Sequence, residues 1–159
     1  MTPAYGRSLK GKKVYSERPT SQKEHYSTFG IIGKEGMLFE HTFKGFLNRF
    51  LLVCILEEFI IKHFVNTNKW LILDNASVHK SRLVIQCLKK HNINYLFLPP
   101  YSPELNPIEL AWSKIKQFVK RKKPRTKSCL ILNILKSSYS ITEKDSHGYY
   151  RHSNSFLAT

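Results

Sequence analysis

Acidic residues are scarce in this sequence, which has 11 Asp and Glu against 26 Lys and Arg and a formal net charge of +15. Such an excess of positive charge opposes compact folding unless a polyanion neutralises it, so nucleic acid is the first partner to expect. The 42% of hydrophobic residues excludes a disordered or fibrous chain. A domain of 159 residues buries about two-thirds of its unfolded surface, so a true core is expected.

Long apolar runs are also missing. The most apolar stretch, residues 46–65, is interrupted by charged residues, and its longest uninterrupted run is the seven residues from Phe50 to Leu56. This run is too short to span a bilayer, and the first residues lack the apolar segment of a signal peptide. We therefore expect no membrane partner and a cytoplasmic, nucleoid-associated location in a bacterial cell.

Cysteine is limited to Cys54, Cys87 and Cys129, which lie more than 30 residues apart. This spacing excludes a zinc finger and disfavours a disulfide framework. We interpret all three as buried thiols.

The first third of the chain predicts a meander of short strands at residues 12–15, 25–32 and 37–42. The last two are separated by Gly33-Lys34-Glu35-Gly36, which suits a hairpin. Residues 46–65 have apolar residues around most of a helix, so this helix should be largely buried on the sheet.

Strands and helices alternate after this point. We predict a buried parallel strand at residues 70–73, a helix at 80–91 capped by Ser77, and a strand at 94–98 stopped by Pro99-Pro100. A proline-rich loop leads to a helix with Pro107 in its first turn and an apolar stripe, formed by Ile108, Ala111, Trp112, Ile115 and Val119. The pattern is that of an α/β fold.

Two carboxylates fall where such a fold collects ligands. Asp74, one of only two aspartates, follows the strand at 70–73, at the sheet edge where ligands bind in open α/β folds. Glu109 lies in the first turn of the later helix, on the flank of its apolar stripe, so it can face a cleft. The alternative is that Asp74-Asn75 only turns the chain.

The motifs around these residues are Asp74-Asn75-Ala76-Ser77-Val78-His79 and Leu98-Pro99-Pro100-Tyr101-Ser102-Pro103-Glu104-Leu105-Asn106-Pro107-Ile108-Glu109, with 34 residues between Asp74 and Glu109. Together they resemble the DDE transposases of the IS630/Tc1/mariner superfamily. The resemblance extends from Tyr5 to about Lys123, and includes Tyr5-Gly6-Arg7-Ser8 and Lys10-Gly11.

The resemblance implies an RNase H-like mixed sheet with flanking helices, in which Asp74 and Glu109 are the second and third acidic ligands of two Mg²⁺ or Mn²⁺ ions. It also implies DNA as partner, both transposon ends and target. Asn75, His79 and Asn106 would be supporting residues. Each also has a structural reading: Asn75 in the turn, His79 in packing at the helix entry, and Asn106 in bonding the loop backbone.

The family's first catalytic Asp has no counterpart here, because no aspartate precedes Asp74. We therefore expect a truncated transposase that lacks the first central strand and the upstream DNA-recognition domain, and that is inactive alone. An upstream half-transposase chain or an intact transposase would be its partner.

A basic cluster lies at the end of the predicted helix that begins at Pro107, and it consists of Lys120, Arg121, Lys122, Lys123, Arg125 and Lys127. It is either a solvated helix end or a DNA-binding surface. We assign residues 1–127 to the truncated catalytic domain and 128–159 to a partly helical tail, with a short helix at 130–135. Two other functions stay open: a non-catalytic DNA-binding remnant that inhibits intact transposase, and a ribosomal-type RNA-binding protein.

Overall fold

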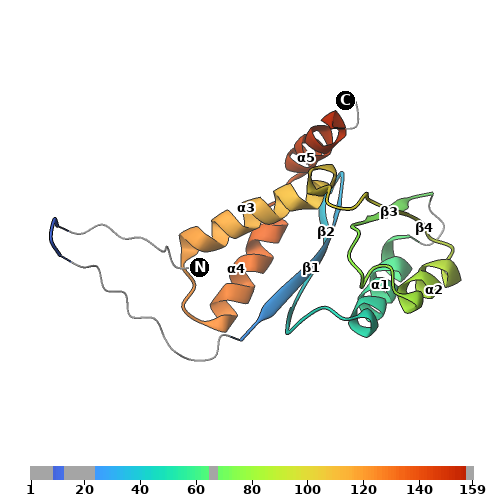
Figure 1. Ribbon diagram of the computed structural model, residues 1–159, viewed down its shortest axis with the longest axis horizontal. Helices are drawn as coiled ribbons and strands as arrows, with labels where there is room; N and C mark the ends of the chain where they lie inside the picture. The colour runs from blue at the N-terminus through green and yellow to red at the C-terminus, as the bar shows by residue number, and fades with distance from the viewer. Residues whose placement is uncertain (1–8, 13–23, 65–67, 157–159) are drawn as a thin grey trace.

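The computed structural model describes residues 9–12, 24–64 and 68–156. It opens with a hairpin of β1 (Tyr26–Gly33) and β2 (Gly36–Lys44), which pair antiparallel (Figure 1). This confirms the two predicted strands and their hairpin. The predicted strand at 12–15 lies outside the described residues except for its first position, as does the Tyr5-Gly6-Arg7-Ser8 segment.

Helix α1 (Arg49–His63) begins where the Asn48 side chain caps it. The amide oxygen of Asn48 accepts hydrogen bonds from the backbone N–H groups of Phe50 and Leu51, each at 3.0 Å. The helix is therefore shorter at both ends than the predicted span of 46–65.

The described side chains of α1 are buried on one face and exposed on the other. Leu52, Ile55, Leu56 and Phe59 are buried, whereas Phe50 and Cys54 are exposed. The prediction of a helix buried around most of its girth is thus wrong, because the described elements cover one face of it.

Strands β3 (Trp70–Leu73) and β4 (Asn94–Phe97) pair in parallel, and α2 (Arg82–Lys90) connects them. This confirms the predicted strand, helix and strand. The sheet is covered on one face, since Leu71 and Leu73 are buried while Trp70 and Ile72 are exposed. The helix starts after Ser81, so the predicted cap at Ser77 is wrong.

A short 3₁₀ helix, η1 (Pro103–Leu105), leads into α3 (Pro107–Lys122), which buries Ala111 and Ile115 as the stripe predicts. Two further helices follow, α4 (Lys127–Tyr139) and α5 (Glu143–Ser155). The tail is therefore more helical than expected, and the short helix predicted at 130–135 is the centre of α4.

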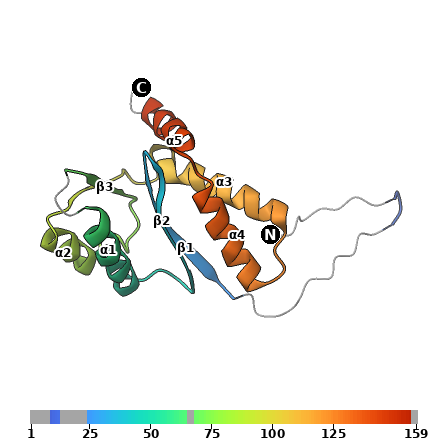
Figure 2. The same cartoon turned by 180° about the vertical axis from the view of Figure 1, so that it is seen from behind.

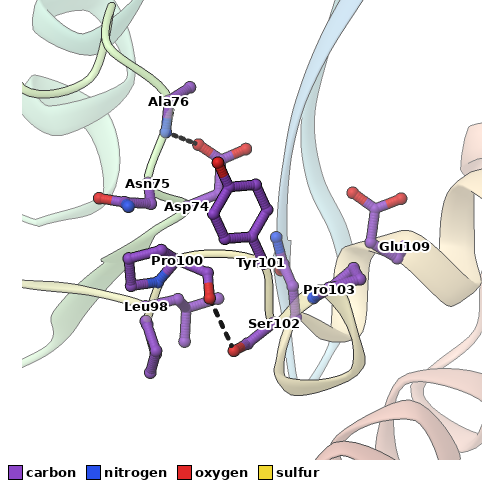
Figure 3. Close-up of a pocket in the computed structure, with 11 residues that line it drawn as sticks. Asp74, Asn75, Ala76, Leu98, Pro100, Tyr101, Ser102, Pro103 and Glu109 are labelled. Carbon is purple, nitrogen blue, oxygen red and sulfur yellow. Dashed lines mark hydrogen bonds between the residues drawn. The ribbon is translucent and has the colours of Figure 1, made fainter.

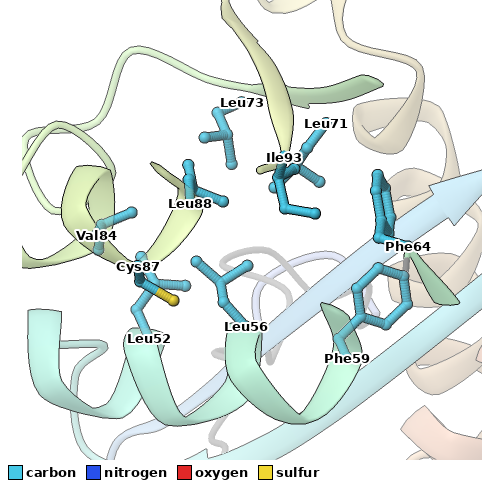
Figure 4. Packing of buried hydrophobic residues seen from close by; sticks show 10 residues of the cluster. All are labelled: Leu52, Leu56, Phe59, Phe64, Leu71, Leu73, Val84, Cys87, Leu88 and Ile93. Carbon is cyan, nitrogen blue, oxygen red and sulfur yellow. The ribbon is translucent and has the colours of Figure 1, made fainter. Parts of the chain in front are cut away.

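The hairpin lies between two hydrophobic cores. On one side α3 and α4 pack against it, and on the other side lie α1, α2, β3 and β4, as Figures 1 and 2 show from opposite directions. The first core is shown in Figure 4 and consists of Leu52, Leu56, Phe59, Phe64, Leu71, Leu73, Val84, Cys87, Leu88 and Ile93. The second contains Ala111, Ile115 and Ile141.

The hairpin supplies side chains to both cores. Phe29 and Ile31 pack on the first, and Ile32 and Met37 pack on the second, with an irregularity in strand pairing between Ile31 and Ile32. The described strands form two separate two-stranded sheets, one antiparallel and one parallel. No helix among the described residues is long and apolar enough to cross a membrane.

The cysteines do not share one environment. Cys87 is buried, but Cys54 and Cys129 are exposed, so the interpretation of all three as buried thiols is wrong for two of them.

Candidate functional site

A pocket of about 410 Å³ lies at the carboxyl ends of β3 and β4. Its walls come from the turn after β3, from the proline-rich loop after β4, and from the start of α3. Asp74 and Glu109, which have 34 residues between them in the sequence, both line it (Figure 3). Asn75 and Asn106 line it as well.

Asp74 is oriented by the turn that follows it. Its Oδ1 atom accepts a hydrogen bond of 3.0 Å from the Ala76 N–H, while its side chain is 48% exposed. Among the described residues no hydrogen bond reaches its other oxygen, Oδ2. The Asn75 side-chain oxygen is buried without a hydrogen-bond partner. The turn thus holds one carboxylate oxygen of Asp74 and leaves the other for a ligand.

His79 lies beneath Asp74. Its side chain is 10% exposed, its Nδ1 lies 2.6 Å from Asp74 Oδ1, and its ring meets Phe29 edge-on at 6.4 Å between centroids. Neither ring nitrogen of His79 has a hydrogen-bond partner among the described residues, so the contact with Asp74 is a close approach and not a hydrogen bond. Both readings of His79 find support here, since the ring packs in the interior and also contacts the carboxylate.

Glu109 projects from the first turn of α3 and is exposed. The positive end of the helix dipole favours a carboxylate at this place. Asn106 is the N-cap of α3, but its side chain makes no capping hydrogen bond. The hydrogen bonds to the loop come from its backbone instead. Its N–H donates to the Pro103 carbonyl, and its carbonyl accepts from the Glu109 N–H.

The pocket offers oxygen donors of the kind that Mg²⁺ and Mn²⁺ prefer. Two carboxylates reach it from separate elements, those of Asp74 and Glu109. No other acidic side chain among the described residues lines it.

Tyr101 is a pocket residue whose role the sequence did not reveal. Its side chain is fully exposed and its backbone has a φ of 57°. Figure 3 shows its ring at the pocket beside Asp74. The signal available was an aromatic residue between two prolines, in the loop that connects β4 to α3.

The basic cluster lies away from the pocket. All of its residues are exposed, and four of them are in the last turn and C-cap of α3, at the opposite end of the helix from Glu109. Lys127 differs from the rest because it forms an ion pair with Glu24, which also pairs with Lys44 at 2.9 Å. These two lysines lower the pKa of Glu24 from 4.5 to about 2.

The first 131 residues match the family described as DDE superfamily endonuclease. Among curated proteins no sequence matches. The match ends inside α4, so the division of the chain at residues 127 and 128 stays a prediction.

Solved structures share the fold. The Mos1 mariner paired end complex with Mn is similar with a TM-score of 0.67 at 15% identity, over 94% of this chain and 46% of that one. The Mos1 strand transfer complex gives a TM-score of 0.68 at 15% identity, over 94% and 45%. The Mos1 transposase catalytic domain with raltegravir and Mg gives a TM-score of 0.60 at 14% identity, over 81% and 78%.

This chain thus spans less than half of the Mos1 chains in the two complexes. The similarity in fold confirms the predicted α/β, RNase H-like class. The narrower IS630 assignment stays a prediction. Because the family model covers most of the sequence, this chain belongs to the DDE superfamily of endonucleases.

Proposed function

We propose that this chain is part of the catalytic core of a Tc1/mariner-type transposase, which cleaves DNA and transfers its strands. The observation that carries the proposal is that Asp74 and Glu109 line one pocket at the end of a parallel strand pair. The family match and the fold of the Mos1 transposase support the same activity. The ends of the transposon and the target DNA are the proposed partners.

Asp74 and Glu109 are the proposed ligands of Mg²⁺ or Mn²⁺, with two ions in the complete enzyme. When bound, such a pair of ions activates the attacking oxygen and stabilises the leaving oxygen of a phosphodiester. The chain's own contribution is to hold the two carboxylates in place: the Ala76 N–H orients Asp74, and the start of α3 positions Glu109.

We further propose that a third carboxylate comes from a β-strand outside the described residues. Two observations support this. Only two acidic side chains of the described residues line the pocket, and each described sheet has only two strands, so each retains unpaired edges. A strand from an upstream half-transposase or from an intact transposase would supply both the missing pairing and the missing ligand.

Metal binding by the purified chain tests the ligand assignment. We expect Asp74→Asn and Glu109→Gln each to weaken Mn²⁺ binding about tenfold or more, measured by electron paramagnetic resonance. Glu104→Gln is the matched control, since Glu104 is an exposed acid of the same loop that does not line the pocket. Equal losses in all three variants would contradict the assignment.

Nicking of supercoiled plasmid DNA tests the need for a further strand. The chain alone should show no cleavage that depends on Mg²⁺ or Mn²⁺, whereas addition of the protein encoded immediately upstream should restore cleavage that Asp74→Ala abolishes. Metal-dependent cleavage by the chain alone, lost in Asp74→Ala, would refute the requirement while supporting the catalytic assignment.

A further inference from the structure

Three side chains that bind metals well meet between α1 and α2, and none of them lines the pocket of Asp74. Cys87 and His91 are four residues apart, so they lie on the same face of α2 and its C-cap. Glu57 comes from α1, which packs against α2. Figure 4 shows the Cys87 sulfur on the side of α2 that faces α1.

The distances suit a single small ion. One donor atom from each side chain can be chosen so that all three lie within 4.8 Å of one another. His91 Nε2 lies 3.7 Å from Glu57 Oε1. Donor atoms around a tetrahedral zinc ion are separated by roughly 3.3 to 3.6 Å, as its bond lengths require, so small side-chain rotations bring the set to that geometry.

The environment is that of a site rather than of a surface ion pair. Cys87 is 5% exposed, and the pKa of its thiol is raised by burial and by the charge of Glu57. The Nε2 atom of His91 is buried and has no hydrogen-bond partner. Buried imidazole nitrogens ordinarily have a hydrogen-bond partner, and a metal ion bound to this nitrogen would take the place of that partner.

We propose that Glu57, Cys87 and His91 bind a zinc ion that ties α1 to α2, with solvent as the fourth ligand. A thiolate, an imidazole and a carboxylate select Zn²⁺ over Mg²⁺, whereas the Asp74 pocket offers only oxygen donors. Glu57 is 38% exposed, which gives the fourth position access to water. This site does not depend on the proposed function.

Lys90 supplies the only other charge that contacts Glu57 among the described residues, with its Nζ 3.4 Å from Glu57 Oε1. Its side chain is 70% exposed, so it can swing into solvent when the carboxylate takes an ion. Lys90→Gln should therefore leave zinc binding intact or strengthen it.

Titration of the full, reduced chain with Co²⁺ tests the site, since cobalt replaces zinc and reports a thiolate ligand by its charge-transfer band. We expect one equivalent to give this band, which Zn²⁺ abolishes and excess Mg²⁺ leaves unchanged. Cys87→Ser should remove the band. His91→Gln and Glu57→Gln should weaken Co²⁺ binding about tenfold or more.

The double variant Cys54→Ser/Cys129→Ser is the matched control, because it removes both exposed thiols and should keep the band. Asp74→Asn should keep it too, which separates this site from the candidate catalytic pocket. Circular dichroism verifies that Cys87→Ser is folded, and His91→Gln tests the site without altering the core. Absence of the band in the wild type, or its loss in the control, would overturn the proposal.

Discussion

Gly30 and Trp112 meet where the hairpin crosses α3. A β-carbon added at Gly30 would lie 2.7 Å from the Cη2 atom of the Trp112 ring, a distance that real contacts essentially never show. The second core therefore depends on the absence of a side chain at this position of β1. The same contact places Trp112 in the core, as the apolar stripe predicts, rather than on a base-stacking surface.

We expect Gly30→Ala to lower the free energy of unfolding by about 1 to 3 kcal/mol, because the ring must shift in a packed core. Denaturant unfolding measures the change. Gly148→Ala is the matched control: it lies inside α5 with nothing within 4 Å of an added β-carbon, so it should stabilise the helix by about 0.5 to 1 kcal/mol. A neutral Gly30→Ala would contradict the tight contact.

Single residues differ in how well the sequence predicts them. Asp74 and Glu109 could be assigned to one pocket because they end a strand and begin a helix at a recognisable spacing. The Glu57, Cys87 and His91 cluster could not, because Glu57 comes from another helix and only packing brings it to the Cys87 and His91 pair.

Helix α5 shows what element prediction misses when the residues are polar. Its start carries a capping box, in which the Thr142 hydroxyl accepts from the Asp145 N–H and the Asp145 carboxylate accepts from the Thr142 N–H at 2.9 Å. That signal was available in the sequence. An apolar periodicity was not available, because the buried positions on this helix are Ser146 and Ser153 instead of large apolar residues.

Asp145 also joins α5 to α3, since Lys114 donates to it at 2.7 Å. Lys114, and then Thr142, lower the pKa of Asp145 from 3.8 to about 2. A carboxyl whose pKa is lower in the folded state contributes stability above its unfolded pKa, and that contribution is lost as the pH falls through the folded value.

Asp145→Asn should therefore reduce the free energy of unfolding at neutral pH by about 1 kcal/mol. Its difference from the wild type should shrink as the pH falls from about 4 to about 2, measured by urea unfolding at several pH values. Glu143→Gln, in the same helical turn, serves as the control and should have little effect, because Glu143 is exposed. A difference that is constant with pH would argue against the ion pair.

Parallel strands illustrate the opposite case. The apolar run at residues 70–73 and the helix after it led directly to β3, α2 and β4. The exposure of Trp70 and Ile72 was not predictable from this run, since it depends on which elements cover the second face of the sheet.

The whole molecule carries a net charge of +15, which should make its affinity for DNA strongly dependent on salt. Changing Lys120, Arg121, Lys122 and Lys123 together to Gln should weaken binding. It should also reduce the slope of log affinity against log salt by up to roughly 3 to 4, if each contacts one phosphate.

Lys127→Gln is the comparison variant. It should change the slope less than the substitution of any one of those four residues does, because Glu24 already pairs with Lys127. Fluorescence anisotropy at several salt concentrations measures both slopes. An unchanged slope in the fourfold variant would show that the cluster is only a solvated helix end.

Helix α3 begins at the candidate pocket and ends at the basic cluster, so in the proposed enzyme its length would set the distance between the two. The 11 residue steps from Glu109 to Lys120 extend about 17 Å along the axis, which equals about five nucleotides of one DNA strand. A DNA phosphate bound by the basic cluster would then determine which phosphodiester bond lies at the two carboxylates. Deleting one residue in between would shorten that span by only about 1.5 Å but rotate the basic cluster by about 100° around the helix axis. The rotation of the basic cluster, and not the small loss of helix length, would then move the scissile phosphodiester away from the carboxylates.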